Sequence, residues 1–149
     1  EPDKKKPGKD AKEADTKKDK DTAAEWITDY KAALAKAKKG KKVVLMDFTG
    51  SDWCGWCKKL KAEVFDKPEF QQWAAKNAIL LEVDFPKHKE LPKELKEQND
   101  KLGKEFDIKG YPTILIVDAK GKKIGQLGYM EGGPEKWTKE ADKLIKKKR

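Results

Sequence analysis

The chain has 149 residues, of which 42% are charged and 36% hydrophobic, and its formal net charge is +9. This length fits one globular domain with or without a tail, and the low hydrophobic content means that apolar residues must be concentrated in a few elements. No apolar run is long enough to span a membrane. Lysines alternate with acids along most of the chain, which is typical of a solvated surface and disfavours a nucleic-acid interface built on net charge.

The N-terminal stretch 1–21 is composed almost wholly of Lys, Asp, Glu, Ala, Pro and Gly. It has no residue that could anchor a core, so we predict a disordered charged linker over 1–21, followed by one domain over 22–149. A nucleic-acid-binding arm is the rival interpretation, but the acids in this stretch would repel phosphate. The chain begins at Glu1 rather than Met, and we expect that an N-terminal segment has been removed.

The first predicted helix runs from Thr22 to Gly40. Thr22 would act as the N-cap and Glu25 would complete a capping box. Apolar side chains recur at helical spacing at Trp26, Tyr30, Leu34 and Ala37. Gly40 is the expected end of the helix.

A short β-branched and apolar run, Val43 to Thr49, predicts a buried strand. A turn follows at 50–52, and a helix is expected to begin at Cys54 and to end near Phe65. Cys54 and Cys57 are the only cysteines in the chain. A cysteine at a helix N-terminus is activated because unpaired N–H groups and the helix dipole favour the thiolate, and a second cysteine one turn on can attack a mixed disulfide formed at the first.

Two simpler interpretations of this pair have to be weighed. A structural zinc site needs four ligands, and His88 is the only other soft candidate. A purely structural disulfide across so short a loop would gain little from loop closure. We therefore interpret the pair as a redox-active dithiol, with no metal and no cofactor expected.

The rest of the chain predicts alternating helices and strands. Asp66 is expected to cap a short helix with Pro68 in its first turn. The further elements are a strand over 79–85, a polar loop over 86–91 in which His88 is solvated, a helix over 92–106, a strand over 114–117, a hairpin turn over 118–121, a strand over 123–128 and a last helix opening at 132–134.

This order of elements, with the blocks "SDWCGWCKKL" and "GYPT", resembles the thioredoxin superfamily over residues 22–149, and in particular its exported bacterial members. The resemblance implies a central mixed four-stranded sheet flanked by helices. It implies that Cys54 is the exposed attacking cysteine, Cys57 the buried resolving cysteine, and Pro112 a cis-proline. It also makes Asp47 a buried acid under Cys57, whose pKa burial would raise toward neutrality, although an ordinary strand-end acid is the alternative.

A docking rim is also expected, formed by Trp53, Trp56, Tyr111, Pro112, Gly128 and Tyr129. An exposed aromatic rim suits loose binding of many extended peptides, and the backbone of Tyr111 would pair with such a peptide as an added strand. Plain packing is the alternative for Trp56 and Tyr129.

Three departures from thioredoxin stand out. The loop from Asp47 to Cys54 is one residue longer, Leu80 replaces a lysine near the buried acid, and Gly55-Trp56 replaces Gly-Pro between the cysteines. The missing proline leaves an extra N–H near the sulfur, which should change the reduction potential in a direction that the sequence leaves open.

The predicted function is therefore thiol–disulfide exchange with protein substrates, as a reductase or isomerase that needs a redox partner. The competing hypotheses are a thioredoxin-like binding or chaperone module with little redox turnover, and nucleic-acid binding through the net charge. A monomer exported to the bacterial periplasm or cell envelope is expected, with the cytoplasm as the alternative.

Overall fold

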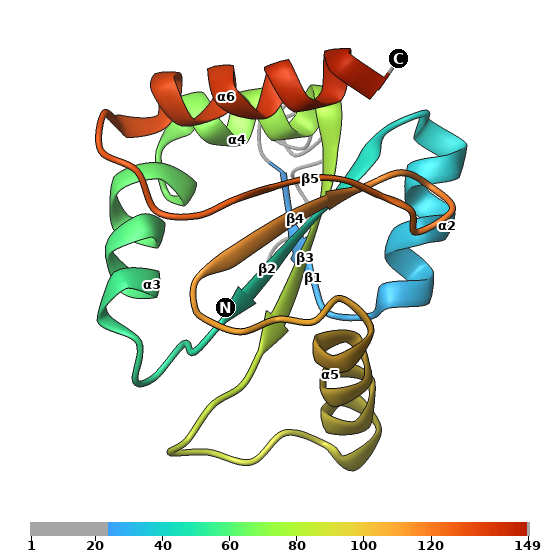
Figure 1. Ribbon diagram of the computed structural model, residues 1–149, viewed down its shortest axis with the longest axis vertical. Coiled ribbons are helices and arrows are strands. Elements are labelled where there is room, and N and C mark those ends of the chain that lie inside the picture. Colours follow the sequence, from blue (N-terminus) through green and yellow to red (C-terminus); the bar gives the residue numbers. More distant parts are fainter. Residues whose placement is uncertain (1–23, 149) are drawn as a thin grey trace, which may run out of the picture.

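The structure is a computed structural model that describes residues 24–148. It contains a five-stranded sheet in the order β1-β3-β2-β4-β5 (Figure 1). The strands are β1 (Trp26–Ile27), β2 (Val43–Thr49), β3 (Ala78–Asp84), β4 (Thr113–Val117) and β5 (Lys123–Leu127). The strands β1, β3 and β2 run parallel, whereas β4 and β5 are antiparallel to their neighbours. The predicted mixed α/β sheet is confirmed, but it has five strands rather than four.

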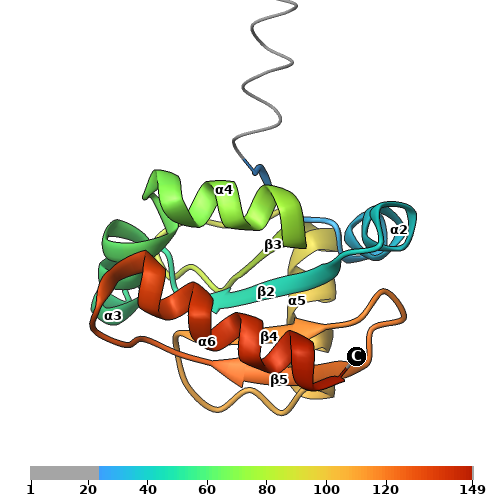
Figure 2. The same ribbon diagram turned by 90° about the horizontal axis from the view of Figure 1, so that it is seen from above.

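Helices cover both faces of this sheet. They are α2 (Tyr30–Gly40), α3 (Gly55–Leu60), a π-helical turn η1 (Lys61–Phe65), α4 (Pro68–Asn77), α5 (Lys93–Glu105) and α6 (Gly133–Lys148). One face carries α3, α4 and α6, and the other carries α2 and α5 (Figure 1 and Figure 2). Among the described residues, no helix is both long and apolar enough to cross a membrane.

The central strands are buried on both faces, which is why they read as continuous apolar runs in the sequence. Successive side chains of β2 enter opposite cores: Leu45 lies in the cluster under α3, α4 and α6, whereas Val44 and Met46 lie in the cluster under α2 and α5. The two clusters together enclose the sheet and hold β2 rigidly. Because β2 leads directly into the cysteine loop, this packing positions the site.

The predicted start of the first helix is wrong. Helix α2 begins at Tyr30, with Asp29 as its N-cap accepting the backbone N–H of Lys31 at 3.1 Å. Trp26 and Ile27 instead form the parallel edge strand β1 against β3. The Trp26 ring packs on Phe65 at 5.1 Å, and this tertiary contact outweighs the helical periodicity. Thr22 and the predicted linker over 1–21 lie outside the described residues.

The other boundaries agree with the prediction within one or two residues, except for one cap. Pro68 occupies the first turn of α4 as expected, but Lys67 is at the N-cap position and makes no capping hydrogen bond there. Asp66 does not cap this helix; it is instead the C-cap of η1, and its carboxylate pairs with Lys61 at 3.0 Å.

Candidate active site

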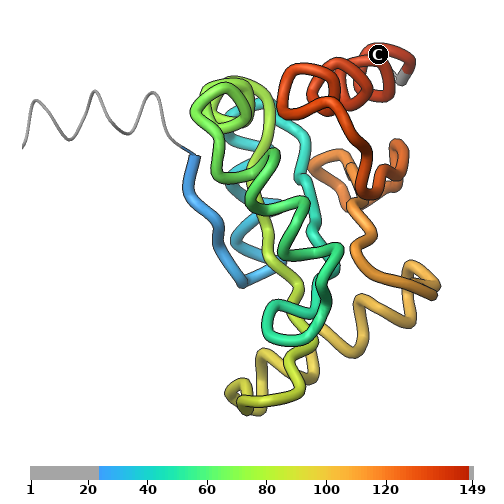
Figure 3. The backbone as a smooth tube through the Cα atoms, turned by 90° about the vertical axis from the view of Figure 1, so that its left-hand side faces the viewer, coloured from blue at the N-terminus to red at the C-terminus, as the bar shows by residue number. Residues whose placement is uncertain are grey.

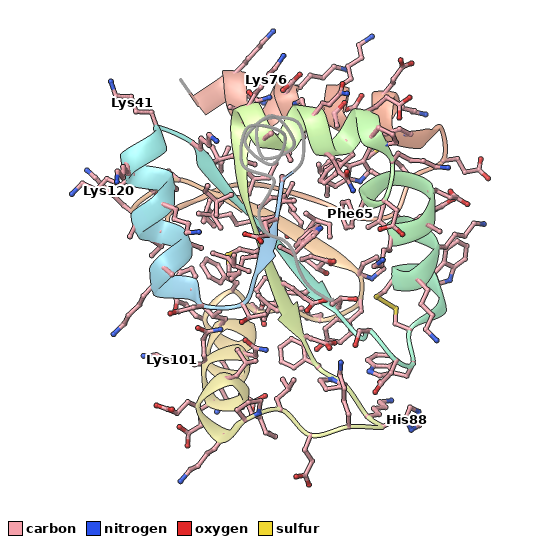
Figure 4. All side chains as sticks on the ribbon, turned by 180° about the vertical axis from the view of Figure 1, so that it is seen from behind. Lys41, Phe65, Lys76, His88, Lys101 and Lys120 are labelled. Carbon is pink, nitrogen blue, oxygen red and sulfur yellow. A yellow bond between two sulfur atoms is a disulfide. The ribbon has the colours of Figure 1, made fainter. Side chains whose placement is uncertain are left out.

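The two cysteines lie at the start of α3, directly after the loop that leaves β2. Cys54 is the N-cap of this helix, and its sulfur accepts the backbone N–H of Cys57 at 3.2 Å. The two residues form a disulfide with their Cα atoms 5.3 Å apart. The yellow bond in Figure 4 shows this disulfide beside α3. The predicted helix-start geometry is therefore present, with one N–H group directed at the Cys54 sulfur.

The expected contrast in exposure between the two cysteines is wrong for this oxidised state. Cys54 is 7% exposed and Cys57 is 6% exposed, so both are buried. Position, not exposure, distinguishes the two: Cys54 caps the helix, whereas Cys57 lies within its first turn.

Asp47 lies on β2 in register with Glu82 on β3, on the sheet face that also carries Leu45 and Leu80. Its Oδ1 atom is buried and has no hydrogen-bond partner among the described residues. Burial, and then the nearby carboxylates of Glu82 and Asp84, raise the pKa of Asp47 to about 8. The predicted upward shift toward neutrality is thus present in the structure.

Glu82 is a second half-buried carboxylate beside Asp47, and the sequence reasoning missed it. Burial and then Asp84 raise the pKa of Glu82, while Lys89 and Lys61 oppose this shift. Leu80, the residue that stands where thioredoxin has a lysine, is in register with Leu45 and is buried. The period of two along β3 could have identified Glu82 as an inward-facing acid next to Asp47.

The loop before Cys54 is held by hydrogen bonds from the segment that follows β3. Asp84 accepts both the backbone N–H, at 2.9 Å, and the hydroxyl of Ser51. Asp52 accepts the backbone N–H groups of Lys87 and His88 at 2.9 and 3.0 Å. These hydrogen bonds tie the loop before Cys54 to the segment that follows β3.

Trp53 also connects the loop before Cys54 to the segment that follows β3. Its indole Nε1 donates to the backbone carbonyl of Phe85 at 2.7 Å. Its ring lies over Gly50, where an added Cβ atom would collide with the indole. Glycine is therefore required at this position for the tryptophan to cover the loop.

The predicted rim residues fall into two ring clusters. Trp53 packs edge-to-face on Tyr111 at 5.6 Å, and Trp56 packs on Tyr129 at 5.2 Å. The Tyr111–Pro112 bond is cis, as the resemblance implied. A Cβ atom added to Gly128 would lie 3.7 Å from the Pro112 carbonyl oxygen, so the strand β5 ends beside the cis-proline.

Trp56 is the most exposed large apolar side chain of the described residues, at 57%. Tyr129 is half-buried, and its hydroxyl donates to Glu63 on η1. This hydrogen bond raises the pKa of Tyr129 to about 12, with smaller contributions from burial and from the charges of Glu63 and Glu131. Sequence patterns do not point to Glu63, because the π-helical turn that carries it departs from regular helical spacing.

His88 is exposed in the loop between β3 and α5. Residues 24–148 contain no group of three or more His, Cys, Asp or Glu side chains arranged to hold a metal ion. A hollow of about 530 Å³ lies next to this loop, lined by residues that include Asp84, Phe85, Lys89 and Asn99. The cysteines do not line it, so it is separate from the disulfide.

Comparisons with known proteins agree with this geometry. A family profile described as a thioredoxin-like domain matches residues 30–145. The disulfide bond reductase DsbH of Chlamydia pneumoniae is 32% identical over 117 residues, covering 78% of this chain and 70% of DsbH. The thioredoxin-related protein DsbJ of the same organism is 32% identical over 116 residues, but this region is only 33% of DsbJ.

A solved structure named DsbH oxidoreductase superposes with a TM-score of 0.79 at 31% identity, covering 83% of this chain and 85% of that one. The profile covers most of the chain, and the matched region includes β2, the cysteine pair and the cis-proline. The chain therefore belongs to the thioredoxin-like family, and its activity is that of a thiol–disulfide oxidoreductase.

Proposed function

We propose that the protein acts as a reductase of protein disulfides, with Cys54 as the nucleophile and Cys57 as the resolving cysteine. The observation that carries this assignment is the hydrogen bond from the Cys57 N–H to the Cys54 sulfur at the start of α3. A donor aimed at this sulfur stabilises the thiolate, which is the attacking form. The name of DsbH, a disulfide bond reductase, supports the reducing direction.

The reaction proceeds in two exchanges. The Cys54 thiolate attacks one sulfur of the substrate disulfide, forms a mixed disulfide and releases the first substrate thiolate, which takes up a proton. Cys57 then loses its proton and attacks the Cys54 sulfur, forming the Cys54–Cys57 disulfide and releasing the second substrate thiolate. Two electrons pass from the protein dithiol to the substrate, so a redox partner must reduce the protein again.

Asp47 is proposed as the proton acceptor for Cys57. It lies on the sheet face covered by α3, and a pKa of about 8 matches proton transfer near neutral pH. The rim of Trp53, Trp56, Tyr111, Pro112, Gly128 and Tyr129 is proposed to bind the substrate chain. A strand of substrate would pair with the backbone of Tyr111 next to the cis-proline.

The direction is tested by equilibrating the protein with glutathione and measuring the reduction potential of the Cys54–Cys57 pair. A reductase is expected near thioredoxin's potential of about −270 mV, whereas a value near about −120 mV would identify an oxidant. The Dsb names of several relatives lead us to propose an exported protein of the cell envelope. Protease accessibility in spheroplasts checks this location.

The roles of the two cysteines are tested with Cys54→Ser and Cys57→Ser and a peptide disulfide as substrate. Cys57→Ser should accumulate a mixed disulfide visible by mass spectrometry, because the second exchange is blocked. Cys54→Ser should form none and should lose turnover. A binding module would instead be supported if the unmodified protein binds the peptide without reducing it and Cys54→Ser binds it with the same affinity.

A further inference from the structure

Each of the two ring clusters beside the disulfide carries a lysine over a tryptophan. Lys87 Nζ lies 4.1 Å from the centroid of the Trp53 ring. Lys59 Nζ lies 5.1 Å from the Trp56 ring and 5.3 Å from the Tyr129 ring. These distances are those of cation–π contacts, which hold the ammonium groups at the rings.

Neither lysine forms an ion pair with a carboxylate of the described residues. The ion pairs formed within residues 24–148 do not include Lys59 or Lys87. Two acids accept hydrogen bonds near these rings, Asp52 from backbone N–H groups and Glu63 from the Tyr129 hydroxyl, and neither is ion-paired with Lys59 or Lys87 within the described residues. The ammonium group beside each tryptophan can therefore form an ion pair with a carboxylate of a bound chain.

The two lysines come from different parts of the fold. Lys59 belongs to α3, whereas Lys87 belongs to the loop after β3, at the end of the molecule opposite α6 (Figure 1 and Figure 3). Trp53 packs with Tyr111, and Trp56 packs with Tyr129, so the two positive charges accompany separate ring clusters. A substrate chain at Cys54 would thus meet an ammonium group at each cluster.

We propose that this surface selects disulfides whose cysteines are flanked by acidic residues. The inference rests on the proposed function as a reductase and adds the charge of its preferred substrate. Opposite charges on a substrate and its docking surface accelerate encounter and fix orientation, and this effect weakens as salt shortens the screening length. Basic flanks would be disfavoured by the same charges.

The test uses the reduced full chain in single turnover against three cyclic peptides that share one disulfide and have Glu, Gln or Lys on both sides of it. The peptide dithiol formed is measured by chromatography after acid quench. At about 0.01 M salt the second-order rate should be about fivefold higher for the Glu peptide than for the Gln peptide, and lower again for the Lys peptide. At about 1 M salt, where the screening length is about 3 Å, the three rates should converge.

The net charge of +9 attracts any anion, so the local effect needs a matched control. The double variant Lys59→Gln/Lys87→Gln is compared with Lys101→Gln/Lys120→Gln, which removes the same charge on the side away from the disulfide (Figure 4). The readout is the ratio of Glu-peptide to Gln-peptide rates, which cancels changes in the cysteine chemistry. The rim variant should lose most of this ratio, and the distant variant should keep it.

The outcomes separate the two proposals. Equal loss of the ratio in both double variants, or a ratio near one in the unmodified protein, overturns the charge preference while leaving the reductase intact. Failure of the unmodified protein to reduce any of the three peptides overturns the proposed function itself.

Discussion

Asp47 is the residue whose state is most sensitive to its surroundings. Its pKa of about 8 lies far above the ordinary value because the carboxyl is buried and faces Glu82 and Asp84. In the unfolded chain the same carboxyl group ionises near its ordinary pKa of 3.8. The folded protein therefore binds a proton at Asp47 that the unfolded chain releases, over the range between these two values.

This difference sets the sign of a pH effect on stability. As pH rises from about 4 to about 8, the free energy of unfolding should fall, because ionising Asp47 costs more in the folded state. Asp47→Asn removes the ionisable group, so it should be more stable than the unmodified protein by an amount that grows over this range. Since one pKa unit corresponds to about 1.4 kcal/mol, the rise in pKa from 3.8 to about 8 predicts a difference of roughly 5 kcal/mol at pH 8 and above, measured by urea unfolding across a pH series.

Glu82→Gln provides the matched control for this prediction. It removes one of the charges that raise the pKa of Asp47, so it should reduce the pH dependence without abolishing it. Parallel stability–pH curves for Asp47→Asn and the unmodified protein would contradict the buried-acid assignment. Asp47→Asn should also slow the attack of Cys57 on the mixed disulfide more than it slows the formation of that mixed disulfide by Cys54.

At the scale of elements, the first helix shows how a cap competes with periodicity. Asp29 caps the start of α2, and Lys41, the C-cap after the last helical residue Gly40, takes a left-handed conformation with φ of 58°. The preceding residues Trp26 and Ile27 join the sheet because β3 offers an open edge there. Sequence periodicity cannot detect such an edge, since it depends on strands far along the chain.

A cap variant tests which residue starts this helix. Asp29→Ala should lower the free energy of unfolding by about 1 kcal/mol, because the N–H of Lys31 loses its acceptor. Glu25→Ala removes the acid of the capping box expected from the sequence, and it should change stability by less than about 0.5 kcal/mol. Thermal or urea unfolding of both variants decides between them, and a larger loss in Glu25→Ala would contradict a start at Tyr30.

At the scale of the whole molecule, Trp137 connects the last helix to the backbone that follows β5. It is fully buried, and its indole donates to the carbonyl of Gly128 at 3.0 Å. Its ring also packs on Phe65 and Phe70 at 5.5 and 5.8 Å, which joins α6 to η1 and α4. One side chain thus holds three helical segments and the backbone beside the cis-proline.

Trp137→Phe should therefore lower the free energy of unfolding more than the same substitution at a less buried tryptophan does. We expect a loss of about 2–4 kcal/mol in the free energy of unfolding, because a cavity forms and the Gly128 carbonyl loses its buried donor. Trp73→Phe is the control: Trp73 is half-buried and its indole donates to Asp142 at 2.8 Å, an acceptor that water can reach. Urea unfolding should show a loss below about 1.5 kcal/mol in this control, and equal losses would contradict the special role of Trp137.

The sequence alone determined the order of strands and helices from Val43 onward and the redox pair at a helix start. These features depend on local patterns: apolar runs, turn residues and the spacing of two cysteines. The resemblance added the cis-proline and the raised pKa of Asp47, and the structure shows both. The role of Asp47 beneath Cys57 stays a prediction.

Only the tertiary structure decided the edge strand at Trp26, the carboxylate pair of Asp47 and Glu82, and the lysines over the tryptophan rings. Each of these joins residues that are far apart in the chain or that face each other across the sheet. Local patterns describe which residues a segment contains, but burial and the distance between charges exist only once the segments have packed together.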